Sequence, residues 1–287
     1  MTKYIVNSLV TAFLLVSIIL IGCKASEGTA ESHSNQALDL VEQHRYNEAL
    51  QECNKAIELD PNYAIAYGTR AFLYNATGQY DLGIADCTKA IKLNINLSAA
   101  NLSGIYSNRG LAYNSKGQYD LGIADCIKAI ELNPNNDEAY CNRSYAYNSK
   151  GQYDAAITDC DKAIKLNPSL ADAYSNRAWA YCGKEQYDLC ITDATKAIDL
   201  DPNCIYAYCN RSYAYNSKAQ YDLGIADCTK AIMLDPTCAT AYNNRAWAYD
   251  DKGQRDMAIA DYKKFITLSN DPQWIEVVKK RIEELSK

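Results

Sequence analysis

A 34-residue repeat is the feature that most constrains how this chain of 287 residues can fold. Tyrosines in matching sequence contexts recur at spacings of 34, 39, 34, 34 and 34 residues, and Arg255 continues the series by one step. A fixed period of this length is typical of architectures in which similar units stack along the chain. Seven units run from about residue 30 to residue 270, and the third is offset by an insertion near Ser98–Leu102. The marker tyrosines are Tyr46, Tyr80, Tyr119, Tyr153, Tyr187 and Tyr221.

Each unit is predicted to form a pair of helices. In the fourth unit, Tyr140, Ser144 and Tyr147 fall on one face of a helix over residues 138–150, and Gly151 then ends that helix. A second apolar stripe with helical spacing follows over residues 153–166, and Pro168 closes the unit because proline cannot continue a helix. One hairpin has too little core to be stable alone, so we expect the hairpins to stack around a continuous core. The predicted fold class is therefore all-α.

These units resemble the tetratricopeptide repeat family over residues 30–270, because small residues recur in two columns where the helices of such repeats cross. The resemblance implies a superhelical solenoid of about seven helix–turn–helix repeats at residues 34–270, with a capping helix at residues 271–287. Phe265 replaces a small residue in the last unit, and we expect it to pack under the terminal helix. Ile95 stands where proline is expected, which predicts an altered stacking angle. The small residues are Ala49, Gly83, Gly122, Ala156, Gly224 and Ala258, and Ala56, Ala90, Ala129, Ala163, Ala197 and Ala231.

Tyrosine is used far more than the other aromatic residues, with 24 Tyr against 3 Phe and 3 Trp. Eighteen of these tyrosines occupy three repeating columns, of which the marker tyrosines are the first. A tyrosine ring fills apolar space while its hydroxyl stays in water, which suits a thin solenoid with few deep positions. We therefore assign the columns to packing. The other two columns are Tyr67, Tyr106, Tyr140, Tyr174, Tyr208 and Tyr242, and Tyr74, Tyr113, Tyr147, Tyr181, Tyr215 and Tyr249.

The N-terminal segment is predicted to be a targeting signal rather than part of the fold. Residues 5–21 are almost wholly apolar and follow Lys3, as in the hydrophobic region of a signal peptide. The run then ends in Leu20-Ile21-Gly22-Cys23, which resembles a bacterial lipobox. The resemblance implies a signal peptide at residues 1–22, lipidation of Cys23, a lipidated tether at residues 23–33 and attachment to the bacterial cell envelope. The alternative is an uncleaved N-terminal transmembrane anchor.

The 12 cysteines are predicted to be mostly unpaired. Equivalent positions on packed helices lie roughly 8–10 Å apart, whereas a disulfide needs Cα atoms within about 7 Å. Cys182 and Cys190 flank one hairpin and are the one pairing candidate. With 2 His and no Cys-x-x-Cys pair, we expect no metal site. Many free thiols are unusual in an exported protein, which hints at a reducing or anaerobic setting. The column predicted to form a buried ladder of thiols is Cys53, Cys87, Cys126, Cys160 and Cys228.

Two charged columns border the packed faces, one of arginines on the first helices and one of aspartates on the second. Charges in such places must be paired to be tolerated. We predict Arg–Asp bridges, and the sequence leaves open whether they form within or between units. The columns are Arg70, Arg109, Arg143, Arg177, Arg211 and Arg245, and Asp86, Asp125, Asp159, Asp193, Asp227 and Asp261.

The candidate binding residues lie on the first helices, whose second face lines a concave groove in the tetratricopeptide family. Asparagine amides there suit the backbone of an extended peptide, and aromatic rings supply apolar contacts. In the alternative interpretation the asparagines bond within the stack and the aromatic residues partly pack on their neighbours. The predicted groove residues form three rows, each one helical turn further on. The first row is Asn108, Asn142, Asn176, Asn210 and Asn244. The second row is Tyr145, Trp179, Tyr213 and Trp247, preceded in earlier repeats by Phe72 and Leu111, and the third is Asn75, Asn114, Asn148 and Asn216.

One functional subtype is disfavoured. Some tetratricopeptide co-chaperones hold a C-terminal carboxylate with a clamp of Lys, Asn and Arg residues, and the Asn-Arg-Ser triplets at residues 142–144 and 210–212 resemble part of that pattern. The clamp lysines are missing, so recognition of a chaperone tail is not expected. The positions where such a lysine is needed hold Glu138, Asp172, Tyr206 and Thr240.

Composition and motifs together predict a protein without catalytic activity. A net charge of −6 and a pI near 5.1 argue against nucleic-acid binding, which needs clustered Lys and Arg. No Gly-rich phosphate loop, nucleophile elbow or Cys–His arrangement is visible, and no cofactor is expected. We predict a scaffold anchored at a bacterial membrane that binds a protein or peptide in the groove. The alternative is a glycan-binding envelope protein whose groove aromatics stack on sugar rings.

Overall fold

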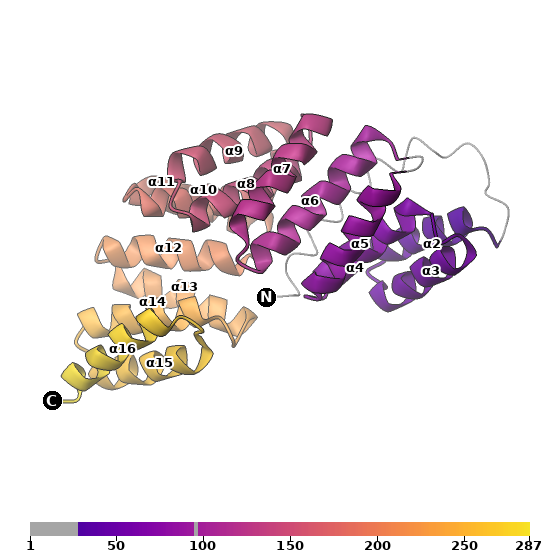
Figure 1. Ribbon diagram of the computed structural model, residues 1–287. Coiled ribbons are helices and arrows are strands. Elements are labelled where there is room, and N and C mark those ends of the chain that lie inside the picture. The colour runs from indigo at the N-terminus through magenta and orange to yellow at the C-terminus, as the bar shows by residue number, and fades with distance from the viewer. Residues whose placement is uncertain (1–27, 95–96) are drawn as a thin grey trace. The chain divides into compact units, whose positions relative to one another are not determined.

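The computed structural model describes residues 28–94 and 97–287, and all regular structure in this part of the chain is α-helical (Figure 1). The helices form two compact parts, divided after Pro168. These parts are called unit 1 and unit 2 from here on, and each single 34-residue repeat is called a hairpin. Unit 1 contains α2 (Ala30–Glu42), α3 (Tyr46–Leu59), α4 (Ala64–Ala76), α5 (Tyr80–Leu93), α6 (Ala99–Ser115), α7 (Tyr119–Leu132), α8 (Asp137–Ser149) and α9 (Tyr153–Leu166). Unit 2 contains α10 (Ala171–Gly183), α11 (Tyr187–Leu200), α12 (Ile205–Ser217), α13 (Tyr221–Leu234), α14 (Ala239–Asp251), α15 (Arg255–Leu268) and α16 (Pro272–Leu285).

Each unit is a stack of helical hairpins, as the repeat predicted. The two helices of every hairpin pack on each other, and each second helix packs on the first helix of the next hairpin within its unit. The first helices of successive hairpins also contact each other directly: α10 contacts α12, and α12 contacts α14. The first helices of a unit therefore share one face, which is where the candidate binding residues were predicted.

The N-terminal boundary of the repeats differs from the prediction. Helix α2 begins at Ala30, because the Thr29 hydroxyl accepts a hydrogen bond from the Ser32 N–H and so caps the helix. The last residues of the predicted tether at 23–33 are therefore helical. The predicted signal peptide and Cys23 lie outside the described residues.

The insertion before the third repeat lengthens a helix. Helix α6 has 17 residues, whereas the first helix of the next hairpin, α8, has 13. The Ser98 hydroxyl caps α6 by accepting from the Asn101 N–H. The inserted residues thus add a turn of helix at the start of the third hairpin. Ile95, where an altered stacking angle is predicted, lies outside the described residues.

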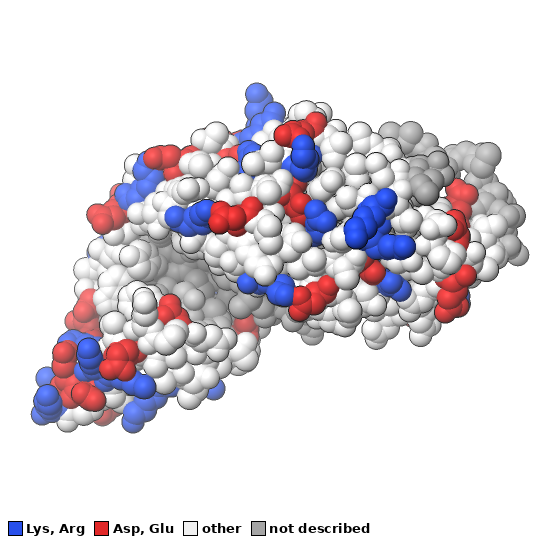
Figure 2. All heavy atoms as spheres, in the orientation of Figure 1, with Lys and Arg blue, Asp and Glu red and all other residues white. Residues whose placement is uncertain are grey.

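The terminal helix covers the end of unit 2. Helix α16 begins after Asp271, whose carboxylate accepts from the Gln273 and Trp274 N–H groups. Val278 is buried in the cluster that contains Phe265, so Phe265 packs under this helix as predicted. Acidic and basic side chains gather over this end of the chain in Figure 2. This helix therefore shields the apolar side of the last hairpin with a charged surface.

Small residues and thiols fill the contacts between helices. The five cysteines of the predicted ladder are each 0% exposed, and none of them is in a disulfide, so this prediction is confirmed. Burial raises the pKa of the Cys53 and Cys228 thiols to about 12, which keeps them protonated. They act as small apolar side chains.

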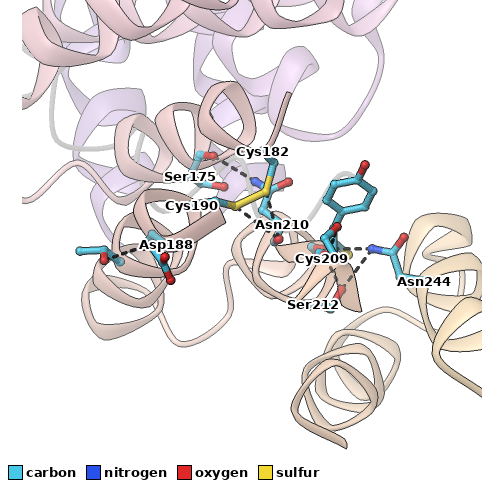
Figure 3. The surroundings of a disulfide bond; sticks show 11 residues. Ser175, Cys182, Asp188, Cys190, Cys209, Asn210, Ser212 and Asn244 are labelled. Carbon is cyan, nitrogen blue, oxygen red and sulfur yellow. Dashed lines mark hydrogen bonds between the residues drawn. A yellow bond between two sulfur atoms is a disulfide. The ribbon is translucent and has the colours of Figure 1, made fainter. Parts of the chain in front are cut away.

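The pairing candidate is also confirmed. Cys182 at the end of α10 and Cys190 in α11 form a disulfide, with Cα atoms 5.5 Å apart (Figure 3). The bond joins the two helices of a single hairpin, because the two residues face each other where these helices cross.

Candidate ligand-binding face of the first helices

The charged columns pair within each hairpin and are not available to a ligand. Arg211 on α12 donates from Nε and Nη2 to the two carboxylate oxygens of Asp227 on α13, both at 2.8 Å. This hydrogen bond raises the pKa of Arg211 above its ordinary value, so the pair stays charged. The same bidentate bridge occurs in Arg70–Asp86, Arg109–Asp125, Arg143–Asp159, Arg177–Asp193 and Arg245–Asp261.

Two tyrosine columns enclose these arginines. The Arg109 guanidinium carbon lies 5.5 Å from the Tyr106 ring centroid and 5.9 Å from that of Tyr113, within the range of cation–π attraction. Every arginine of the column has such a pair of rings. These tyrosines therefore support the ion pairs, which agrees with their assignment to packing.

The first asparagine column links neighbouring first helices. The Asn210 amide donates to the Ser175 carbonyl at 3.0 Å, and the Asn244 amide donates to the Cys209 carbonyl at 3.1 Å. Asn142 reaches the hydroxyl of Ser107 in the same way, at 3.1 Å. These bonds are those of the alternative interpretation, in which the asparagines hold the stack together. Asn108 and Asn244 are also buried, so their prediction as ligand contacts is wrong, whereas Asn142, Asn176 and Asn210 are half-buried.

The second asparagine column is wholly internal. Asn114, Asn148 and Asn216 are only 2–3% exposed, so their prediction as groove residues is wrong. The Asn216 amide donates to the Asn244 carbonyl of the next hairpin at 2.8 Å. Asn114 donates to the Asn142 carbonyl at the same distance. A polar side chain in this place is buried because it satisfies a carbonyl of the following repeat.

This column also explains the glycines opposite it. A Cβ atom built on Gly224 would lie 2.0 Å from the Asn216 Oδ1 atom, and one on Gly122 would lie 1.9 Å from the Asn114 Oδ1 atom. The amide therefore occupies the space that a larger residue would need. At Gly122 and Gly224 the absence of a side chain therefore leaves room for the asparagine that makes the inter-repeat hydrogen bond.

The aromatic row starts in the core of unit 1. Phe72 is 2% exposed and Leu111 packs on the same cluster, so neither faces a ligand. Tyr145 is half-buried, its ring centroid lies 6.5 Å from that of Tyr119, and burial raises its pKa to about 12. In this unit the row is therefore largely occupied with packing.

In unit 2 the same row reaches the surface. Tyr213 on α12 is 40% exposed, and its ring centroid lies 5.6 Å from that of Trp247 on α14 and 6.4 Å from that of Tyr187. Trp247 and Trp179 are half-buried. The Trp247 indole N–H donates to the Asp251 carboxylate at 2.9 Å, which orients the ring. These rings form a pre-arranged aromatic surface on neighbouring helices.

One exposed residue of this surface was missed as a contact. Tyr206 is 49% exposed and precedes Tyr213 by seven residues on α12, so the two lie on one side of the helix. In the sequence, Tyr206 stands out only as a position where a clamp lysine is absent. Its spacing from Asn210 and Tyr213 was the signal that could have identified it. We define the aromatic face as Trp179, Tyr206, Tyr213 and Trp247.

Within the residues that the structure describes, no group of three or more His, Cys, Asp or Glu side chains is arranged to hold a metal ion. Over the same residues, every helix is too short or too polar to cross a lipid bilayer.

Comparison with known families identifies the repeats. Models described as tetratricopeptide repeat or TPR repeat match most of the chain between residues 30 and 272. The chain belongs to the tetratricopeptide repeat family. The matched segments of this tetratricopeptide repeat protein are residues 30–63, 52–85, 104–136, 126–158, 144–184, 171–204, 205–238 and 239–272.

Solved structures agree with this fold. A tetratricopeptide repeat protein from Parabacteroides merdae is 19% identical, with a TM-score of 0.63 over 90% of this chain and 99% of that one. The APC/C assembly Cut9–Hcn1 contains a chain 18% identical, with a TM-score of 0.69 over 85% of this chain and 46% of the other. At these identities the likeness concerns the fold alone.

Curated relatives match over a short segment. Serine/threonine-protein phosphatase 5 of Rattus norvegicus is 39% identical over 72 residues, which cover 24% of this chain and 14% of the phosphatase. The human phosphatase of that name is 38% identical over 65 residues, 23% of this chain and 13% of its own length. The chain thus spans about a seventh of the length of these relatives. Tetratricopeptide repeats indicate a scaffold for protein–protein interaction.

Proposed function

We propose that this tetratricopeptide repeat protein is a non-enzymatic scaffold that binds an extended peptide segment of a partner protein on the aromatic face of unit 2. The observation that carries the proposal is the exposed aromatic cluster on α12 and α14. Tyr206 and Tyr213 are 49% and 40% exposed, although other tyrosines of the repeats are enclosed against arginines. Large rings held at the surface by their neighbours are typical anchors of protein interfaces.

The chemistry of the face favours apolar contacts with the partner. Arg177, Arg211 and Arg245 of this unit are held by aspartates of their own hairpins. The positions where a carboxylate clamp needs lysine hold Asp172, Tyr206 and Thr240. A peptide with aromatic or branched aliphatic side chains therefore fits this face better than an acidic tail does. Half-buried Asn210 lies between Tyr206 and Tyr213 on α12, near the backbone of such a peptide.

Peptide selection followed by substitution tests the proposal. Peptides would be selected from a random display library on the full chain, and their affinity measured by titration calorimetry. Tyr213→Ala and Trp247→Ala should each weaken binding at least tenfold, a loss of about 1.4 kcal/mol or more, as expected of interface anchors. Tyr213→Phe should retain binding, because it keeps the ring.

Leu189→Ala is the matched control, since Leu189 is 47% exposed on a second helix. Circular dichroism would show that each variant is folded. Unchanged affinity in both Tyr213→Ala and Trp247→Ala would refute the aromatic face as the binding site. Binding on a glycan array that these substitutions abolish, with no peptide selected, would replace the peptide by a sugar ligand.

Attachment to a membrane through lipidated Cys23 is a separate proposal, supported by the apolar segment and the sequence Leu20-Ile21-Gly22-Cys23. Mass spectrometry of the protein extracted from membranes should find an acylated N-terminal Cys23. An N-terminus that still contains Met1 would refute cleavage and favour an uncleaved anchor.

A further inference from the structure

A second pair of cysteines lies between two hairpins of unit 2. The sulfur atoms of Cys209 and Cys238 are 3.7 Å apart, and neither residue is in a disulfide. Cys209 belongs to α12, and Cys238 is the residue directly before α14. Sulfur atoms at this separation need only small side-chain movements to bond. A bond here would join successive repeats, whereas Cys182–Cys190 joins helices of one hairpin.

We propose that Cys209 and Cys238 form a reversible disulfide between repeats, made by thiol–disulfide exchange with a small soluble disulfide. The pair is a site of redox modification that would tie α12 to the start of α14.

The two thiols are unequal, which gives each a part in the exchange. Cys238 is partly exposed and Cys209 is 4% exposed. The pKa of Cys238 lies below its ordinary value, because of its hydrogen bond with the Cys209 thiol, and the Ala241 and Thr240 N–H groups at the start of α14 add to this effect. The hydrogen bond to Cys238 and burial raise the pKa of Cys209. Cys238 is therefore the attacking thiolate and Cys209 the resolving thiol.

The exchange balances in two steps. The Cys238 thiolate attacks one sulfur of the soluble disulfide, forms a mixed disulfide and releases one small thiolate. Cys209 then gives up its proton and attacks the Cys238 sulfur, which forms the bond between Cys209 and Cys238 and releases the second small thiolate. The chain loses two electrons and two protons, and the soluble disulfide becomes two thiols.

The other thiols of unit 2 provide internal controls. Cys204, before α12, stands where Cys238 stands before α14, but the side chain that interacts with its thiol is the hydroxyl of Ser175. Cys228 is 0% exposed, and burial raises its pKa to about 12. Neither geometry supports exchange, so modification should be confined to one pair of repeats.

The bond would act close to the aromatic face. Helices α12 and α14 carry Tyr213 and Trp247, and the Asn244 amide of α14 already bonds to the Cys209 carbonyl (Figure 3). Oxidation would therefore add a covalent link beside an existing hydrogen bond. The spacing of α12 and α14 would be held by both.

The test uses oxidised glutathione as the probe. Full-length protein would be reduced under native conditions, freed of reductant, incubated with the probe, alkylated and digested without reduction. Mass spectrometry should find a peptide pair joined through Cys209 and Cys238. Cys209→Ser should leave glutathione trapped on Cys238, and Cys238→Ser should lose both products. Cys204→Ser should leave the product unchanged.

Ser175→Cys tests the geometry itself, because it places a second sulfur beside Cys204 and should yield a second link between repeats. Circular dichroism would confirm that each variant is folded. Stable glutathione on wild-type Cys238 without the link would overturn the proposal. So would alkylation of both thiols after oxidation, when the Cys182–Cys190 bond has re-formed in the same sample.

Discussion

Two neighbouring hairpins of unit 2 have different residues at the equivalent place where their two helices cross. In α10–α11 a disulfide joins Cys182 to Cys190. In α12–α13 the corresponding residues, 34 positions later, are Asn216 and Gly224. The Asn216 side chain packs against Gly224 and donates its amide to the Asn244 carbonyl of the next hairpin.

The difference separates stability within a repeat from coupling between repeats. The disulfide ties the two helices of one hairpin. Both of its sulfur atoms lie 3.5 Å from the Asn210 carbonyl, but a disulfide has no hydrogen to donate to it. Asn216, in contrast, bonds to the following hairpin. The stability of a repeat stack is approximately the sum of these two kinds of contribution, so the same position can serve either.

Reduction of the Cys182–Cys190 disulfide should lower the unfolding free energy more than any other change that distinguishes the two hairpins. The residues are 8 positions apart, and closing a loop of that length is worth about 2–3 kcal/mol in the chain-entropy account. Urea unfolding with and without reductant would measure the loss. The experiment is best done in a Cys209→Ser, Cys238→Ser double variant, in which reductant cannot act on that pair. An unchanged midpoint would show that the disulfide adds no stability.

Loss of the inter-repeat bond should have the next largest effect. Asn216→Ala removes the donor to the Asn244 carbonyl, which is buried, and should cost about 1–2 kcal/mol of unfolding free energy. Hydrogen exchange of the α14 amides should accelerate more than that of α10, since α14 receives the bond. Ser217→Ala is the control, because Ser217 bonds within its own helix. Equal acceleration in α10 and α14 would contradict a role in coupling.

The smallest effect on the unfolding free energy is expected at mildly alkaline pH, because the two hairpins also differ in the column of buried thiols. Helix α13 has Cys228, whereas α11 has Ala194 at the corresponding place. Burial raises the pKa of Cys228 to about 12 in the folded state, above that of an exposed thiol. The stabilisation by the protonated thiol is fully present below pH ~9 and is lost as the pH rises toward ~12, so at pH ~9.5 the folded state has lost about 0.8 kcal/mol of it.

Comparison of wild type with Cys228→Ala isolates this contribution. The difference in their unfolding free energies, measured by urea unfolding at increasing pH, should shift in favour of the alanine variant. A difference that does not change with pH would show that Cys228 keeps its ordinary pKa in the folded chain.

The sequence predicted the fold well because its information is local and repeated. The 34-residue period runs through all the hairpins, and the closing prolines and the small residues at helix crossings recur in most of them, so the hairpins support one another's assignment. The burial of the cysteine ladder and the packing of Phe265 under α16 followed from the same reasoning. The extra turn of α6 was not foreseen, because an insertion with helical propensity looks the same as a longer loop.

The candidate site was predicted less well, for a physical reason. Asn114 and Asn216 occupy the helical positions expected of ligand contacts, but they are buried because their amides satisfy carbonyls of the next repeat. A hydrogen-bonding side chain has the same signature in sequence whether its partner is a peptide or a neighbouring helix. Tyr206 was overlooked because it recurs in no other repeat.

The sequence alone determined the all-α repeat, the number of hairpins and the columns that fill their contacts, because helical spacing and period are properties of the chain itself. Only the tertiary structure decided how Arg and Asp pair, which asparagines are internal, and which aromatic rings of unit 2 remain exposed. It also brought Cys209 to Cys238 across two repeats. These outcomes depend on distances between hairpins, which a linear pattern does not contain.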